Sequence, residues 1–211
     1  MRAAAALLLL LAGCGAPAQT SGGTTAPPRP VPVAFPDDPR PLSRYHSGRL
    51  GVSLPLPDGH AWRIDDHSQP ELVATHAPTA SRVLVAVMRA DDLVGRTQCE
   101  ALARDRKLVP SQLHELEQEV GVTLQSFDTR TVLAVDPGAT PDEPLVGHVM
   151  AFGGFLRKCF VFDFSTRVDR VQDEPILSAR LAYARARILG GLQLDVLGAV
   201  KRQEPETPAP P

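Results

Sequence analysis

The sequence predicts an α+β domain in which helices cover both faces of an antiparallel β-sheet. Segments with the two-residue alternation of strands come in two groups, separated by a stretch with helical signals. A last amphipathic segment follows the second group. Strands and helices in separate runs are typical of an antiparallel sheet with helices packed on it, rather than of alternating parallel units.

The first group contains three predicted strands. Apolar residues at 50, 52, 54 and 56 alternate with Gly51, Ser53 and Pro55, and the proline favours a sheet edge or a strand end. Strands are also expected at 71–77 and 82–90, joined by a hairpin turn. The segment 82–90 is apolar at both sets of alternating positions, which predicts a central strand covered on both faces.

Two helices are expected between the strand groups. Thr97 and Glu100 fit the capping-box spacing and predict the start of a helix that Pro110 ends. Ser111 is the expected cap of a second helix, with Gly121 as its stop. The inward positions of this second helix are expected at Leu113, Leu116 and Val120.

The second group and the last helix supply most of the predicted core. A hairpin is expected around Gly153-Gly154, between strands that run from 145 to 165. Phe160, Phe162 and Phe164 alternate and therefore share one face, with Cys159 on the other. The last helix is expected from about Asp173 to Gly190-Gly191. Its apolar stripe is Leu177, Leu181, Ala184 and Ile188, at the spacing of one helix face.

The N-terminus predicts an export signal. Arg2 precedes an apolar run, residues 3–11, that is too short to span a membrane. A positive start, a short apolar core and a small-residue exit indicate a secretory signal peptide.

The exit Leu11-Ala12-Gly13-Cys14 resembles the bacterial lipobox. The resemblance implies that residues 1–13 are removed and that Cys14 becomes an acylated N-terminus, as in palmitate-bearing lipoproteins. Several acyl chains give a stable membrane anchor. Residue 15 is Gly rather than Asp, and the same resemblance then favours the outer membrane, facing the periplasm or the cell surface.

Lipidation of Cys14 leaves two cysteines in an oxidising compartment. Disulfides persist there, so a bond between Cys99 and Cys159 is expected; two buried free thiols are the alternative. The bond requires the first helix to lie on the sheet face opposite Phe160, Phe162 and Phe164. The last helix then covers the phenylalanine face.

Composition divides the chain into four parts. The Pro-rich stretch after the signal and the C-terminal QEPETPAPP cannot bury enough apolar surface to form a core. The expected parts are a signal peptide at 1–13, the lipidated Cys14 with a disordered tether at 14–44, one globular domain at 45–197 and a disordered tail at 198–211.

Charge and motifs exclude several functions. A net charge of −2 gives no electrostatic footprint for nucleic acid. Nucleotide-binding glycine motifs and the nucleophile elbow are absent from the sequence. His114-Glu115 begins a zinc-protease motif, but position 118 is Gln. The cluster His60, Asp65, Asp66 and His67 contains possible metal ligands, yet a solvated loop is the favoured interpretation. We therefore assign no catalytic residue, metal site or cofactor.

Residues 51–62 (GVSLPLPDGHAW), the paired strands after them and the terminal helix resemble the PsbP/Mog1-like α/β sandwich. The likeness spans about residues 45–197 and rests on element order. It implies a binding or assembly module, so the expected function is a non-catalytic envelope lipoprotein that binds a protein partner. The chain itself would be a subunit of a secretion, assembly or motility complex of the envelope. The alternative is a periplasmic or surface enzyme or metal-binding lipoprotein.

Overall fold

The computed structural model describes residues 33–35, 42–124, 127–136 and 143–195. The chain divides into two units, Met1–Val31 and Pro32–Pro211, and every described residue belongs to the second. The predicted signal peptide, Cys14 and the tail at 198–211 lie outside the described residues. Among the helices that are described, none is long and apolar enough to cross a membrane.

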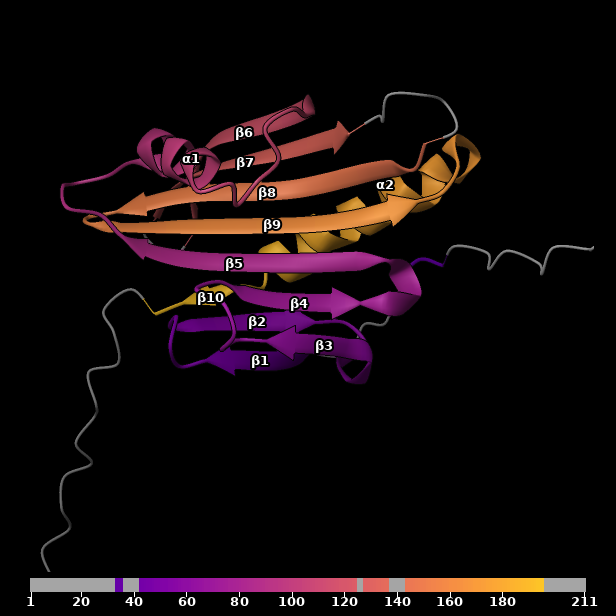
Figure 1. The fold of residues 1–211 in the computed structure, drawn as a ribbon, viewed down its shortest axis with the longest axis horizontal. Coiled ribbons are helices and arrows are strands. Elements are labelled where there is room, and N and C mark those ends of the chain that lie inside the picture. The colour runs from indigo at the N-terminus through magenta and orange to yellow at the C-terminus, as the bar shows by residue number, and fades with distance from the viewer. Residues whose placement is uncertain (1–32, 36–41, 125–126, 137–142, 196–211) are drawn as a thin grey trace, which may run out of the picture. The chain divides into compact units, whose positions relative to one another are not determined.

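Two antiparallel sheets form the second unit (Figure 1). The seven-stranded sheet has the order β3-β4-β5-β9-β8-β7-β6, and each neighbouring pair is antiparallel. Its strands are β3 (Trp62–Asp65), β4 (Leu72–His76), β5 (Ser81–Arg89), β6 (His114–Leu124), β7 (Phe127–Asp136), β8 (Leu145–Phe155) and β9 (Lys158–Val168). The three-stranded sheet has the order β1-β2-β10, with β1 (Ser43–Ser47), β2 (Val52–Leu56) and β10 (Gln193–Leu194).

Helices lie on opposite faces of the large sheet (Figure 1). Helix α1 (Arg96–Asp105) covers one face, and α2 (Glu174–Tyr183) covers the other. Helix α2 continues directly into a π-helical segment, η4 (Ala184–Leu189), before the chain turns into β10. Short 3-10 turns are η1 (Gly59–Ala61), η2 (Ala77–Thr79) and η3 (Val171–Asp173).

Each face of the large sheet carries its own apolar core. Phe160, Phe162 and Phe164 are fully buried on the α2 face, together with the helix stripe Leu177, Leu181, Ala184 and Ile188. On the opposite face, Cys99 and Ala103 of α1 belong to a second core cluster with residues of β5, β7, β8 and β9. The expected sandwich, with the last helix on the phenylalanine face and the first helix on the other, is confirmed.

A disulfide joins the first helix to the centre of the sheet. Cys99 in α1 and Cys159 in β9 are bonded, with their Cα atoms 5.3 Å apart, and both are fully buried. The bond lies in the core between α1 and the sheet, as the expected sandwich requires.

The predicted second helix at 111–121 is wrong, because this segment is the edge strand β6. It pairs with β7 from His114 to Leu124, with irregular register at two points. The 3–4 spacing of its apolar residues suggested a helix, yet Leu116 and Val120 are exposed rather than inward. Long-range pairing with β7 therefore overrides the local helical pattern. Glutamates and bulges on an exposed edge also discourage pairing with other chains.

The predicted turn at Gly153-Gly154 is also misplaced. Both glycines lie inside β8, and the chain reverses at Leu156 and Arg157, where Leu156 adopts a positive φ of 51°. A Cβ at Gly154 would lie 2.5 Å from the carbonyl oxygen of Val94. Glycine is needed here because the chain entering α1 passes directly over the strand.

The N-cap of helix α1 lies two residues before the predicted N-cap, Thr97. Gly95 is the N-cap, and its N–H donates to the Gln98 side chain (3.0 Å). Glu100 instead binds Arg104 of α1 (2.8 Å) and Arg130 of β7. Burial raises the pKa of Glu100, but the hydrogen bonds from the two arginines outweigh it, so this pKa lies below its usual value.

The boundary of the domain lies earlier than the predicted residue 45. Strand β1 begins at Ser43, inside the expected tether. Phe35 is also packed, with 6% of its surface exposed, in the same core cluster as the β9 phenylalanines. The expectation of disorder through residue 44 is therefore wrong for these described residues, because Phe35 and β1 bury apolar surface that composition alone did not reveal.

We expect Gly154→Ala to lower the free energy of unfolding by about 1–3 kcal/mol, because the new methyl group must displace the backbone at Val94 and Gly95. Chemical denaturation measures this change. Gly48→Ala is the matched control: a Cβ there meets nothing within 4 Å, so its effect stays within about 0.5 kcal/mol. Equal effects of the two substitutions would contradict the proposed close approach.

Candidate functional site

A groove lies between the last helical turn and the edge of the large sheet. Its volume is about 460 Å³, and its exposed walls are mostly apolar. The lining residues are Glu119 from β6, Thr129 and Thr131 from β7, Ala182 from α2, Arg185, Ala186 and Leu189 from η4, and Gly190. Small side chains on the helix leave this space open, since Ala182 and Ala186 carry only a methyl group each.

Polar groups stand at defined places in the groove. The hydroxyl-bearing Thr129 and Thr131 are buried, at 1% and 8% exposure. At the rim, Arg185 donates to Glu117 Oε2 (2.9 Å) and also forms an ion pair with Glu119. These pairs connect η4 to β6 across the groove. An apolar trough with a few fixed polar groups is the usual architecture of a binding site.

The π-helical segment shapes one wall of the groove. The sequence ARARIL places Arg185, Ala186 and Leu189 on the lining side, while Ala184 and Ile188 are buried in the core. Short π-helical segments within α-helices occur frequently at functional sites. The lining contains Glu, Thr and Arg side chains but neither His nor Cys.

A second hollow of about 480 Å³ lies at the turn between β8 and β9. It is lined by Val87, Met88, Arg89, Phe155, Leu156, Arg157 and Lys158. These residues come from strand ends and a turn, and Leu156 is 61% exposed. No helix contributes to its lining. We therefore regard the groove beside η4 as the better-built site.

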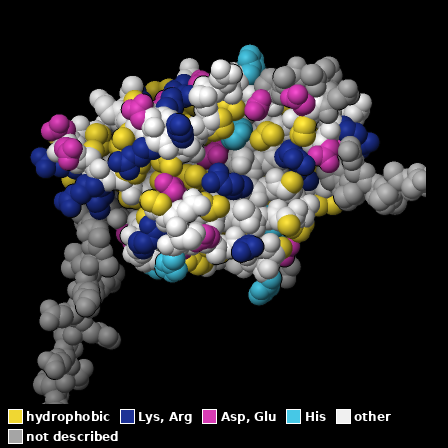
Figure 2. All heavy atoms as spheres, in the orientation of Figure 1, with side chains coloured by type: hydrophobic (Ala, Val, Ile, Leu, Met, Phe, Trp, Pro, Cys, Tyr) yellow, Lys and Arg dark blue, Asp and Glu magenta, His cyan; other side chains and the backbone are white. Residues whose placement is uncertain are grey.

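The face that carries α1 has a mixed surface. Figure 2 shows Lys and Arg side chains interspersed with Asp and Glu, with hydrophobic side chains visible between them. A surface with both signs side by side creates no strong field that would favour a ligand of one charge.

The predicted cluster His60, Asp65, Asp66 and His67 does not converge. His60, Asp65 and His67 are exposed, whereas Asp66 is buried at 6% exposure. Asp66 accepts hydrogen bonds from Tyr45 (3.2 Å), Ser47 (3.1 Å) and Arg49 (3.0 Å). No group of three or more possible metal ligands occurs among the described residues.

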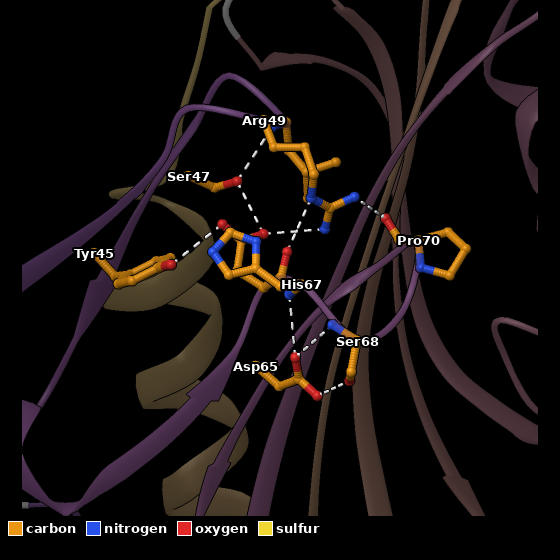
Figure 3. A network of polar contacts seen from close by, with 9 residues as sticks. Tyr45, Ser47, Arg49, Asp65, His67, Ser68 and Pro70 are labelled. Carbon is orange, nitrogen blue, oxygen red and sulfur yellow. Dashed lines mark hydrogen bonds and ion pairs between the residues drawn. The ribbon is translucent and has the colours of Figure 1, made fainter.

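The Asp66 network connects the two sheets. Tyr45 and Ser47 belong to β1, and Asp66 directly follows β3 (Figure 3). Arg49 also donates to the carbonyl oxygens of Asp66 (2.9 Å) and Pro70 (2.7 Å). Burial, followed by the nearby Asp66 charge, raises the pKa of Tyr45. The network therefore positions the small sheet rather than a ligand.

Asp65 has a separate, local role in the same loop. Its carboxylate accepts from the Ser68 hydroxyl, the Ser68 N–H (3.0 Å) and the His67 N–H (3.1 Å) (Figure 3). These hydrogen bonds, chiefly those from Ser68, lower the pKa of Asp65 to about 2. Such contacts are typical of an aspartate that stabilises a turn.

His76 in β4 and His148 in β8 are buried and hydrogen-bonded. His148 contacts Asp163 on the neighbouring strand, with 2.9 Å between Nδ1 and Oδ1. His76 contacts Thr79 at 2.8 Å through Nδ1, while its Nε2 is buried without a hydrogen-bond partner. Asp58 Oδ2 lies 3.8 Å from that nitrogen. Burial, opposed by Asp58, lowers the pKa of His76.

Sequence reasoning did not find the groove. Its lining comes from β6, β7 and η4, which are far apart in the sequence, and β6 was expected to be a helix. The one available signal was the pair of alanines at 182 and 186, four residues apart on a helix face.

Comparisons with known proteins define the fold class. No protein-family profile matches the chain, and no curated protein matches it. The Ran-binding protein Mog1p of Saccharomyces cerevisiae has a similar structure, with a TM-score of 0.51, 8% identity, and coverage of 72% of this chain and 96% of that one. This likeness shows the fold alone: the protein is an α+β sandwich of the PsbP/Mog1-like type.

Two further solved structures are similar at lower scores. Cyanobacterial PsbP from Synechocystis has a TM-score of 0.47 and 13% identity, and covers 73% of this chain and 92% of that one. LpqN of Mycobacterium tuberculosis, described as involved in cell envelope biogenesis, has a TM-score of 0.44 and 13% identity, with coverage of 72% and 89%.

We expect Asp66→Ala to lower the free energy of unfolding by about 2–3 kcal/mol, because it removes the acceptor of several buried or half-buried donors. Urea denaturation followed by circular dichroism measures the change. Asp65→Ala, in the same loop but exposed, should have a smaller effect. An Asp66→Ala variant as stable as the wild type would show that the network does not hold the sheets together.

Proposed function

We propose that the chain is a non-catalytic, lipid-anchored protein of the cell envelope whose domain binds a protein partner. The main support for this proposal is the pairing and sequence context of the three cysteines. Cys99 and Cys159 are bonded to each other, which leaves Cys14 within the lipobox-like Leu11-Ala12-Gly13-Cys14. Stable disulfides are rare in reducing compartments, so the bond supports export, and the tetrapeptide supports acylation.

The proposed location follows from the same leader. Acylated Cys14 would hold the domain on a membrane, and Gly15 in place of Asp favours the outer membrane. The domain would then face the periplasm or the cell surface.

The groove beside η4 is the proposed site for the partner. It offers apolar walls at Ala182, Ala186 and Leu189, and a rim ion pair between Arg185 and Glu119. An apolar side chain from a partner would fill the trough, while Arg185 and the β6 glutamates would meet polar groups at its edge. Apolar anchors within a polar rim are common in protein–protein interfaces.

The anchor is tested by Cys14→Ala. The wild type is expected in the membrane fraction, with the mass of the attached acyl chains on an N-terminal Cys14. The variant is expected to retain its leader or to become soluble, because no acyl chain can be attached. Fractionation and intact-mass spectrometry provide the readouts. Wild-type protein without added acyl mass would contradict the proposal.

The binding site is tested by Ala186→Trp. The indole should fill the groove and reduce recovery of a specific partner from solubilised envelopes at least tenfold, with little change in melting temperature because residue 186 is exposed. Ser178→Trp is the control on the same helix, exposed but outside the groove. Quantitative mass spectrometry of the recovered proteins compares the two. Identical partner sets with both variants would refute the groove as the site.

A further inference from the structure

An aromatic slot receives Phe35 at one end of the large sheet. Phe35 stacks on Trp62 with 6.2 Å between ring centroids and an interplanar angle of 12°. Three further rings surround it: His76 at 5.4 Å, Phe164 at 6.1 Å and Tyr183 at 5.3 Å. These residues come from β3, β4, β9 and α2, so the slot is made by the folded domain.

A buried arginine holds the backbone of the same segment. Arg180 of α2 is 1% exposed, and its Nε donates to the carbonyl oxygen of Val33 (2.7 Å). Its Nη1 donates to the carbonyl oxygens of Thr79 (2.8 Å) and Arg167 (3.0 Å). The domain therefore recognises one aromatic side chain and one main-chain carbonyl two residues before it.

The walls of the slot are positioned without help from Phe35. Trp62 donates its indole N–H to the carbonyl oxygen of Pro57 (2.6 Å), and His76 is hydrogen-bonded to Thr79. Arg180 also donates to the Thr79 and Arg167 carbonyls, and neither contact involves segment 33–35. A site whose walls are fixed in advance loses little conformational entropy when it binds a ligand.

Among the described residues, Arg180 and the rings of the slot make the contacts to segment 33–35 described above. Val33 and Ala34 are exposed, and neither belongs to a strand of either sheet. Burying one phenylalanine side chain favours the docked state by only about 10- to 100-fold. Phe35 also precedes Pro36, and a residue before proline favours an extended backbone. The contact thus has the features of a bound peptide rather than of a strand in a core.

We propose that the slot is a peptide-binding site for an aromatic residue in an extended segment, and that the chain's own segment 33–35 is its resident ligand. The segment docks reversibly in cis. If Cys14 is lipidated, which rests on the proposed function, docking shortens the tether between the membrane and the domain. The tether then runs from Cys14 to residue 33 rather than to the start of β1.

The test uses the oxidised full chain with Cys14→Ala, so its outcome does not depend on acylation. Phe35→Ala empties the slot in this chain. A capped synthetic peptide of residues 29–38 (RPVPVAFPDD) is then titrated against it, with fluorescence of Trp62, the single tryptophan, as the signal. We expect saturable binding. The chain with Phe35 intact should bind the peptide at least tenfold more weakly, because its own segment competes at a millimolar effective concentration.

The controls separate peptide binding from loss of the fold. The peptide with alanine in place of phenylalanine should not bind, and Val33→Ala, which keeps the carbonyl and Phe35, should behave like the parent chain. A folded Phe35→Ala chain that does not bind the peptide would overturn the proposal, as would equal affinity of both chains. If dimers appear in which segments are exchanged between copies, the slot is still a peptide site, and the second copy is its ligand.

If the Phe35→Ala chain does not fold, the test uses the Cys14→Ala chain with Phe35 intact. Reversible docking then requires the Trp62 fluorescence transition in urea to precede the loss of circular dichroism. Coincident transitions would mean that Phe35 is an ordinary core residue, and the proposal would be wrong.

Discussion

Burial of β9 on both faces is the constraint on which the rest of the structure depends. Phe160, Phe162 and Phe164 need cover on one side, while Cys159 and Val161 need it on the other. A sheet whose central strand is apolar on both faces cannot leave either face to water, so helices must pack on both. The disulfide fixes the first helix over its face. On the face that carries Phe160, Phe162 and Phe164, α2 and η4 pack against the sheet.

The small sheet extends the core on the α2 side. Val52, Leu54 and Leu56 of β2 are buried in the same cluster as the β9 phenylalanines. Arg44 of β1 donates to the carbonyl oxygen of Gly191 (2.9 Å), just after η4. The Asp66 network ties β1 to the loop after β3. Together these contacts hold the small sheet against η4 and the loop after β3.

The sequence predicted the parts of the fold that depend on strict periodicity. The alternation around Phe162 and the stripe through Leu181 each identify a buried face without reference to any other segment. Prediction failed where contacts with distant segments determine the local structure. The segment around Leu116 is an edge strand because β7 pairs with the residues on either side of it, Glu115 and Glu117. Gly153 lies inside β8 because it pairs with Thr129 of β7. Local spacing contains no information about either partner.

The groove beside η4 and the aromatic slot could not be predicted from the sequence either, because both are formed by segments that are far apart in the chain. Arg185 meets Glu117 across 68 residues of sequence, and Arg180 meets the Val33 carbonyl across 147. A cavity of this kind forms only when segments far apart in the sequence come together. No local sequence motif therefore predicts it. The arginines differ in burial: Arg180 is enclosed, and desolvation lowers its pKa, whereas Arg185 sits at a rim open to water. The enclosed Arg180 donates to backbone carbonyls inside the domain, while the more exposed Arg185 pairs with Glu117 and Glu119 at the rim of the groove.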